Sequence, residues 1–118
     1  MKKLAVIDDE PLIRKYLTVI LSEKFEVISF SSAKDALNHF QKDKSIDFIL
    51  SDYLMDDMNG LDLLDHLIKK NYFKNAKNSF CFMTAFENNE IHYKLIKSGC
   101  RVVGKSFLSI KTIEDFFE

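Results

Sequence analysis

The sequence predicts an α/β fold, a doubly wound five-stranded parallel sheet with helices on both faces. Two observations lead to this prediction. Five short apolar runs are each too short for a helix, and between them apolar residues recur every three or four positions, as on one face of a helix. Strict alternation of strand and helix is typical of a parallel sheet. For five strands we expect the order 2-1-3-4-5, a flavodoxin-like (βα)5 arrangement.

The five predicted strands are rich in branched and aromatic residues. They lack a strict alternation of apolar and polar positions, as expected for strands that are covered on both faces. In chain order they are Leu4–Ile7, Phe25–Phe30, Phe48–Leu50, Phe80–Met83 and Val102–Val103.

Helical patterns occupy the intervals between these runs. Pro11 suits the first turn of the first helix, where a missing backbone donor is not needed. Ser32, with Asp35 three residues later, predicts the start of the second helix. The third, fourth and fifth helices are indicated by the apolar positions within 61–68, 91–96 and 110–117. Residues 71–78 are expected to form a longer connection without an element of their own.

Length and charge narrow the class of protein. The 118 residues fit one domain, expected to cover 1–118, and the net charge of -1 argues against a dedicated nucleic-acid binder. No apolar stretch approaches the ~20 residues that a membrane span needs, so we expect no membrane segment and a cytoplasmic location. Cys81 and Cys100 lack the spacing of a metal or redox motif and are expected to be ordinary reduced thiols.

Polar residues follow four of the five predicted strands. Asp8 and Asp9 follow the first, Asp52 the third, Thr84 the fourth and Lys105 the fifth. Because the carboxyl ends of parallel strands lie on one edge of a sheet, we expect these side chains to meet there.

The chemistry of these side chains points to a divalent cation and to phosphoryl transfer. Clustered carboxylates repel one another in a partly desolvated crevice, and oxygen ligands of this kind suit Mg²⁺ or Mn²⁺. Lys105 supplies a positive charge and Thr84 a hydroxyl. A nucleophilic aspartate, a metal, a cation and a hydroxyl are the parts that phosphoryl transfer onto a carboxylate requires.

The whole chain resembles response-regulator receiver domains of the chemotaxis-regulator type. The resemblance is carried by Asp8-Asp9, by the loop Asp52-Tyr53-Leu54-Met55-Asp56-Asp57-Met58-Asn59-Gly60, by Thr84-Ala85 and by Lys105-Ser106-Phe107. It implies two-component signalling in which Asp52 takes a phosphoryl group from a histidine kinase, a phosphotransfer protein or a small acyl phosphate. Such a domain catalyses its own phosphorylation and dephosphorylation and is not a turnover enzyme.

The resemblance also implies residue roles and partners. Asp9, Asp52 and the carbonyl of Leu54 would hold Mg²⁺ directly and Asp8 through water, while Thr84 and Lys105 would contact the phosphoryl group. The fourth helix, the fifth strand and the fifth helix would bind a downstream protein target, with the domain a monomer or a phosphorylation-dependent dimer.

Several positions depart from the family pattern. Asp56 replaces the usual proline of the acceptor loop, and Asp56 and Asp57 are expected to be solvated loop acids rather than ligands. Ser106 replaces a proline that follows a cis peptide, so that peptide is either strained or trans. Val102 stands where an aromatic switch residue is frequent, with Phe86 as a substitute for part of that role.

Leu54 and Phe86 occupy positions that in this family modulate the access of hydrolytic water. Both are apolar, which predicts slow self-dephosphorylation.

Other readings stay open at this point. The departures at Asp56, Val102 and Ser106 allow a receiver-fold interaction scaffold that does not switch. The chain is also compatible with the N-terminal receiver of a larger regulator that carries an effector domain. A phosphatase-type hydrolase is disfavoured, because no Asp-x-Asp follows the first predicted strand and there is no cap insertion.

Overall fold

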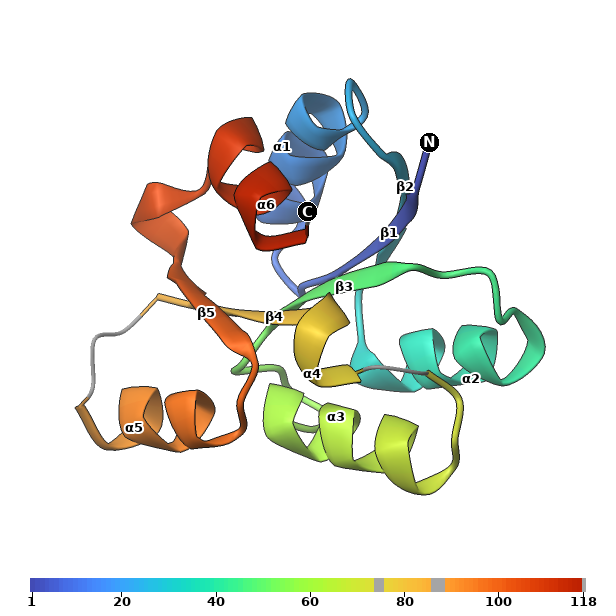
Figure 1. The fold of residues 1–118 in the computed structure, drawn as a ribbon, viewed down its shortest axis with the longest axis vertical. Helices are drawn as coiled ribbons and strands as arrows, with labels where there is room; N and C mark the ends of the chain where they lie inside the picture. Colours follow the sequence, from blue (N-terminus) through green and yellow to red (C-terminus); the bar gives the residue numbers. More distant parts are fainter. Residues whose placement is uncertain (74–75, 86–88, 118) are drawn as a thin grey trace.

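The computed structural model describes residues 1–73, 76–85 and 89–117 and shows a five-stranded sheet (Figure 1). The strands are β1 (Lys3–Ile7), β2 (Glu26–Phe30), β3 (Phe48–Asp52), β4 (Phe80–Thr84) and β5 (Arg101–Gly104). Every pairing is parallel, in the order β2-β1-β3-β4-β5. The predicted fold class and strand order are confirmed, and the predicted strands differ from the observed ones by one or two residues at their ends.

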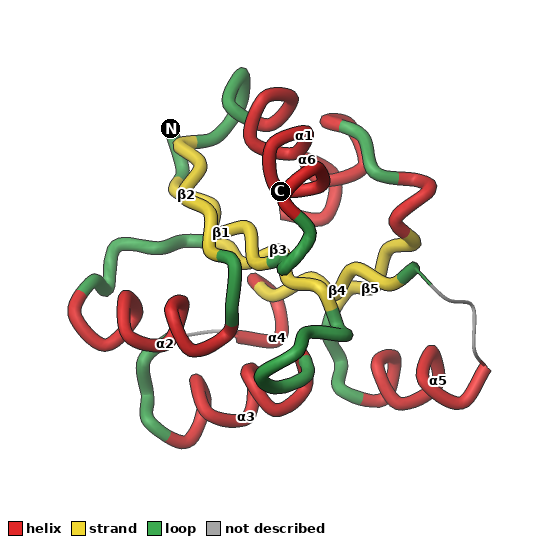
Figure 2. Tube along the Cα trace, turned by 180° about the vertical axis from the view of Figure 1, so that it is seen from behind, coloured by secondary structure: helices red, strands yellow, loops and turns green. Residues whose placement is uncertain are grey.

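The helices cover both faces of the sheet (Figures 1 and 2). On one face lie α1 (Pro11–Leu21) and α6 (Ile110–Phe117), and on the other α2 (Ala33–Lys42), α3 (Gly60–Lys69) and α5 (Asn89–Lys97). A short helix, α4 (Ala76–Ser79), lies in the segment where the sequence predicts only a connection. With four residues it is too short to show a helical period, so the pattern of apolar residues gives no signal for it.

Two hydrophobic cores fill the spaces between the sheet and these helix layers. Successive strand residues point to opposite faces, so Leu4 of β1 belongs to the core beneath α1 and α6 while Ala5 belongs to the core beneath α2 and α3. Phe48 stacks on Phe117 with 4.6 Å between ring centroids, which joins the last helix to the start of β3. The strand ends are thereby held between two packed layers.

Three helices begin at side chains that cap their free backbone amides; at α6 the Thr112 amide donates to Ser109 Oγ at 3.1 Å. Ser32 Oγ accepts a hydrogen bond from the Asp35 amide at 3.1 Å, which confirms the predicted start of α2. Asn59 Oδ1 accepts one from the Asp62 amide at 2.9 Å at the start of α3. Asn59 ends the loop that follows Asp52, so this cap also fixes where that loop stops.

Among the described residues no helix is long and apolar enough to cross a membrane. Cys81 and Cys100 are both buried free thiols, as expected, and burial raises the pKa of each.

Candidate functional site

Three carboxylates meet at the carboxyl edge of the sheet. Asp8 directly follows β1, and Asp52 ends the neighbouring strand β3. The two strands pair in parallel up to Ile7 and Ser51, so the residues that come next, Asp8 and Asp52, lie side by side. One oxygen each from Asp8, Asp9 and Asp52 lies within 4.8 Å of the others. Asp8 is fully buried and Asp52 is 4% exposed, so these charges repel one another away from bulk water.

Lys105 points its ammonium group into this acidic cluster. Its Nζ lies 2.9 Å from Asp8 Oδ2 and 3.1 Å from Asp52 Oδ2, with Glu10 Oε1 at 3.6 Å. Lys105 begins a single 3-10 turn, η1 (Lys105–Phe107), immediately after β5. The described residues contain no cis peptide, so the Lys105–Ser106 bond is trans and the second of the two alternatives at Ser106 is the correct one.

The electrostatics of the cluster favour a further cation. Burial raises the pKa of Asp52 to about 6, and the charge of Asp8 adds to this effect while the Lys105 ammonium opposes it. Burial alone would lower the pKa of Lys105, but its contacts with Asp8 and Asp52 outweigh this and raise it. Within the described part of the chain Asp8 Oδ2 receives no hydrogen bond, only the ion pair with Lys105. The one positive charge of Lys105 therefore does not balance the negative charges of the three clustered carboxylates.

The loop after β1 is held by contacts that the sequence analysis did not find. Asp8 Oδ1 accepts the Glu10 amide at 2.8 Å, and Arg14 Nη1 on the first turns of α1 donates to the Asp8 carbonyl at 2.8 Å. Both contacts fix the backbone that presents Asp8 and Asp9. The spacing Asp8…Arg14 carries no motif on its own, because it becomes meaningful only once the turn into α1 is known.

The loop after Asp52 returns closely to the strand from which it leaves. The Tyr53 amide donates to the Met83 carbonyl at 2.9 Å, and the Gly60 amide donates to the Tyr53 carbonyl at 2.7 Å. A Cβ atom at position 60 would lie 2.8 Å from the Asp52 carbonyl oxygen, so only glycine fits this close approach. Leu54, between these contacts, is half exposed.

Thr84 completes the set of predicted site residues. It ends β4, is 9% exposed and lines a cavity of about 200 Å³ together with Glu10, Asp52, Leu54, Ala85 and Lys105. The structure thus brings Asp52, Leu54, Thr84 and Lys105 to one hollow, with the Asp8 and Asp9 carboxylates beside Asp52.

Four further positions singled out in the sequence have different outcomes. Val102 lies on β5 opposite Phe82, half buried against the core. Phe86, its suggested substitute, lies outside the described residues. Asp56 and Asp57 are both exposed, as expected, and the Asp57 carboxylate in addition accepts the backbone amides of Ala33 and Lys34 at the start of α2.

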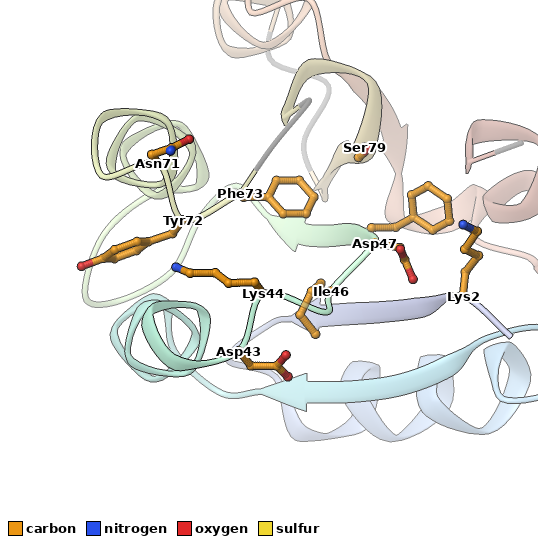
Figure 3. Close-up of a pocket in the computed structure, with 10 residues that line it drawn as sticks. Lys2, Asp43, Lys44, Ile46, Asp47, Asn71, Tyr72, Phe73 and Ser79 are labelled. Carbon is orange, nitrogen blue, oxygen red and sulfur yellow. The ribbon is translucent and has the colours of Figure 1, made fainter.

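A larger cavity, of about 590 Å³, lies at the opposite edge of the sheet (Figure 3). Three of its charged side chains have partners: Asp43 lies 2.9 Å from His39, Lys44 Nζ lies 4.4 Å from the Tyr72 ring centroid, and Asp47 accepts a backbone N–H from the start of β1 at 2.8 Å. Satisfied groups of this kind leave little for a ligand to bind. We therefore place the functional site at the carboxyl edge, around Asp52.

Comparison with known proteins identifies the family of the chain. The model of the response regulator receiver domain family matches residues 4–112. The chain belongs to this family: it is a receiver domain of a response regulator in two-component signalling. Receiver domains of this family generally bind Mg²⁺ and interact with histidine kinases or phosphotransfer proteins.

The curated relatives match only part of the chain. Two-component response regulators ORR1 from the japonica and indica subspecies of Oryza sativa are 33% identical over 72 residues, which covers 52% of this chain and 31% of theirs. The match therefore spans about a third of the length of these relatives.

Solved structures of low sequence identity share the fold. A receiver domain protein of Clostridium thermocellum is 22% identical with a TM-score of 0.85, covering 99% of this chain and 91% of that one. The response regulator protein TrrA of Thermotoga maritima, solved in complex with Mg²⁺-BeF, is 27% identical with a TM-score of 0.77, covering 98% and 96% of the two chains.

Proposed function

We propose that this receiver accepts a phosphoryl group on Asp52 in a Mg²⁺-dependent reaction and that the modification changes its affinity for a partner protein. The observation that carries the proposal is the acidic cluster: the nearly buried Asp52 lies within 4.8 Å of oxygens of Asp8 and Asp9 and 3.1 Å from the Lys105 ammonium.

The donor in this proposal is a phosphohistidine of a histidine kinase or phosphotransfer protein, or a small acyl phosphate. A carboxylate oxygen of Asp52 attacks phosphorus, a P–O bond forms, and the bond from phosphorus to the donor atom breaks with its electron pair leaving on the donor. Even with its pKa raised to about 6, Asp52 is largely ionised at neutral pH, so no general base is needed.

The residues present fit a hard divalent cation, Mg²⁺ or Mn²⁺. Asp9, Asp52 and the Leu54 carbonyl would hold it directly and Asp8 through water. Two features of the chain support this: the unbalanced negative charge of the three carboxylates and the buried Asp8 Oδ2 that receives no hydrogen bond within the described residues. When bound, the cation neutralises the charge that develops during transfer.

Thr84 and Lys105 line the same hollow as Asp52 and are the candidates for contacting the phosphoryl oxygens after transfer. The Lys105 ammonium already contacts the Asp52 carboxylate. It is therefore positioned to contact the negatively charged oxygens of a phosphoryl group on Asp52. Positioning and electrostatics of this kind supply most of the catalysis in phosphoryl transfer.

The proposed output is binding of a downstream protein target at the face formed by α5, β5 and α6, which are the fourth helix, fifth strand and fifth helix of the sequence prediction. Two large apolar side chains of α5 are exposed there, Tyr93 at 60% and Ile96 at 54%. We propose a cytoplasmic domain that is monomeric or dimerises on phosphorylation, with no direct contact to nucleic acid or membrane.

Intact-protein mass spectrometry after incubation with acetyl phosphate tests the proposal. We expect the wild-type protein to gain the mass of one phosphoryl group with Mg²⁺ present and to gain none with EDTA, and Asp52→Asn to gain none in either condition. A wild-type protein that is never modified and binds no beryllofluoride would instead favour the non-switching scaffold, the alternative suggested by Val102 and Ser106.

A further inference from the structure

The loop after Asp52 has Asp56 where the family pattern has a proline, and the next side chain of the loop, Asp57, contacts another element. Asp57 Oδ2 accepts a hydrogen bond from the Lys34 amide at 2.8 Å, and Asp57 Oδ1 a longer one from the Ala33 amide at 3.4 Å. Both amides belong to the first turn of α2, which is more than twenty residues away in the sequence. The loop is therefore tied to another element and not only to its own strand.

The first residues of α2 are held in place by burial and by a helix cap. Ala33 is fully buried in the core, and Ser32 caps the Asp35 amide. The first amides of a helix have no partner within the helix, so a carboxylate there completes their hydrogen bonding and matches the positive end of the helix dipole. Hydrogen bonds from an amide to an ionised acceptor are also stronger than neutral ones.

Asp57 is well placed to order the middle of the loop. The Tyr53 and Gly60 amides fix the two ends of the loop, through the Met83 and Tyr53 carbonyls. For the stretch 54–58 between them, the hydrogen bonds that the described residues show are those of Asp57. Leu54 lies three residues before Asp57, inside the stretch whose position these bonds set.

We propose that Asp57 is a positioning residue for the metal site. By tying the loop to α2 it holds the backbone of Leu54, whose carbonyl would be a metal ligand, at a fixed place relative to Asp52. Asp57 acts through Leu54 and is not itself a ligand in this account. The inference rests on the proposed function, because it concerns the same Mg²⁺ site.

The test compares two neighbouring aspartates. Asp57→Ala and Asp56→Ala each remove one negative charge from the same loop, and both residues are exposed, but Asp56 makes no hydrogen bond or ion pair within the part of the chain that is described. Mg²⁺ affinity of the unphosphorylated proteins is measured by isothermal titration calorimetry. We expect Asp57→Ala to weaken the Mg²⁺ Kd about tenfold more than Asp56→Ala, the range typical for residues that orient metal ligands.

A conservative variant and a second readout separate positioning from a general loss of stability. Asp57→Asn keeps an oxygen acceptor for the Lys34 amide and is expected to lie between the wild-type protein and Asp57→Ala in Mg²⁺ affinity. Amide hydrogen exchange without Mg²⁺ should show faster exchange of the Gly60 amide in Asp57→Ala than in Asp56→Ala.

The outcomes are distinguishable. If Asp57→Ala lowers the unfolding midpoint but binds Mg²⁺ as well as Asp56→Ala does, Asp57 only stabilises α2 and this inference is wrong while the proposed function stands. If the wild-type protein itself binds no Mg²⁺, the proposed function is wrong and the inference falls with it.

Discussion

Replacing Asp52 by asparagine is expected to stabilise the folded protein at neutral pH, although it removes the proposed phosphoacceptor. Asparagine has the shape of the protonated carboxyl but carries no charge. In the folded protein Asp52 is nearly buried beside Asp8, and its pKa rises from 3.8 to about 6. Ionising Asp52 is therefore more costly in the folded protein than in the unfolded chain.

The sign and size of the effect follow from that pKa difference. Below about pH 4 the carboxyl is protonated in both states and the variant gains nothing. Between pH 4 and 6 the unfolded chain releases the proton first, so wild-type stability falls relative to the variant as the pH rises. Above pH 6 the free energy of unfolding of Asp52→Asn exceeds that of the wild-type protein by the full amount, about 2 to 3 kcal/mol. The lower figure allows for solvent screening at the open side of the cluster.

Urea unfolding at a series of pH values with EDTA measures this difference. At pH 7 we expect the midpoint of Asp52→Asn to lie about 1 to 2 M above that of the wild-type protein, given the usual dependence of stability on urea for small domains. Asp56→Asn, at an exposed aspartate of the same loop, is the matched control, and its urea midpoint at pH 7 is expected to lie close to that of the wild-type protein.

Mg²⁺ provides a second check, because it should stabilise the wild-type protein more than Asp52→Asn and so narrow the gap between them. A gain that is equal at pH 4 and pH 8, or a variant that is less stable than the wild-type protein at pH 7, would refute the reasoning.

Three further predictions concern neighbouring residues. Lys105→Met is expected to lower the free energy of unfolding at pH 7 by about 3 kcal/mol in urea titrations, because Asp8 and Asp52 lose their buried counter-charge; an unchanged value would contradict this. Gly60→Ala is expected to destabilise by about 1 to 3 kcal/mol in thermal unfolding, since its Cβ would meet the Asp52 carbonyl oxygen at 2.8 Å, and a neutral effect would show that the loop relaxes freely. Leu54→Asn is expected to shorten the lifetime of the phosphorylated protein severalfold, measured by loss of label, because a half-exposed apolar side chain keeps water from the site; an equal lifetime would count against slow self-dephosphorylation.

Much of the fold was predictable because it depends on periodicity. The pattern from Pro11 to Leu21 and the Ser32 cap with Asp35 are local signals, and the structure confirms both. The short helix Ala76–Ser79 was missed because four residues contain barely one turn.

The site was predictable to the extent that it lies at strand ends. A parallel sheet brings Asp8, Asp52, Thr84 and Lys105 to one edge whatever their separation in sequence, and the structure places them there. The Asp57 contact with the start of α2 was not predictable, because it depends on how a loop folds against a helix and leaves no periodic trace.

The contact that holds the backbone of Asp8 was not predictable from the sequence either. Arg14 donates to the Asp8 carbonyl only because α1 turns back toward the end of β1. Sequence reasoning named the charged groups, while the contacts that hold them required the three-dimensional arrangement.

Locating the phosphoryl group tests the central claim most directly. The protein is incubated with acetyl phosphate and Mg²⁺, the acyl phosphate is reduced with borohydride, and the digested peptides are sequenced by mass spectrometry. Borohydride converts a phosphorylated aspartate to homoserine, so we predict homoserine at position 52 and aspartate at positions 8, 9, 56 and 57. Homoserine at another of these positions, or none at position 52 in a protein that has gained phosphoryl mass, would contradict the account.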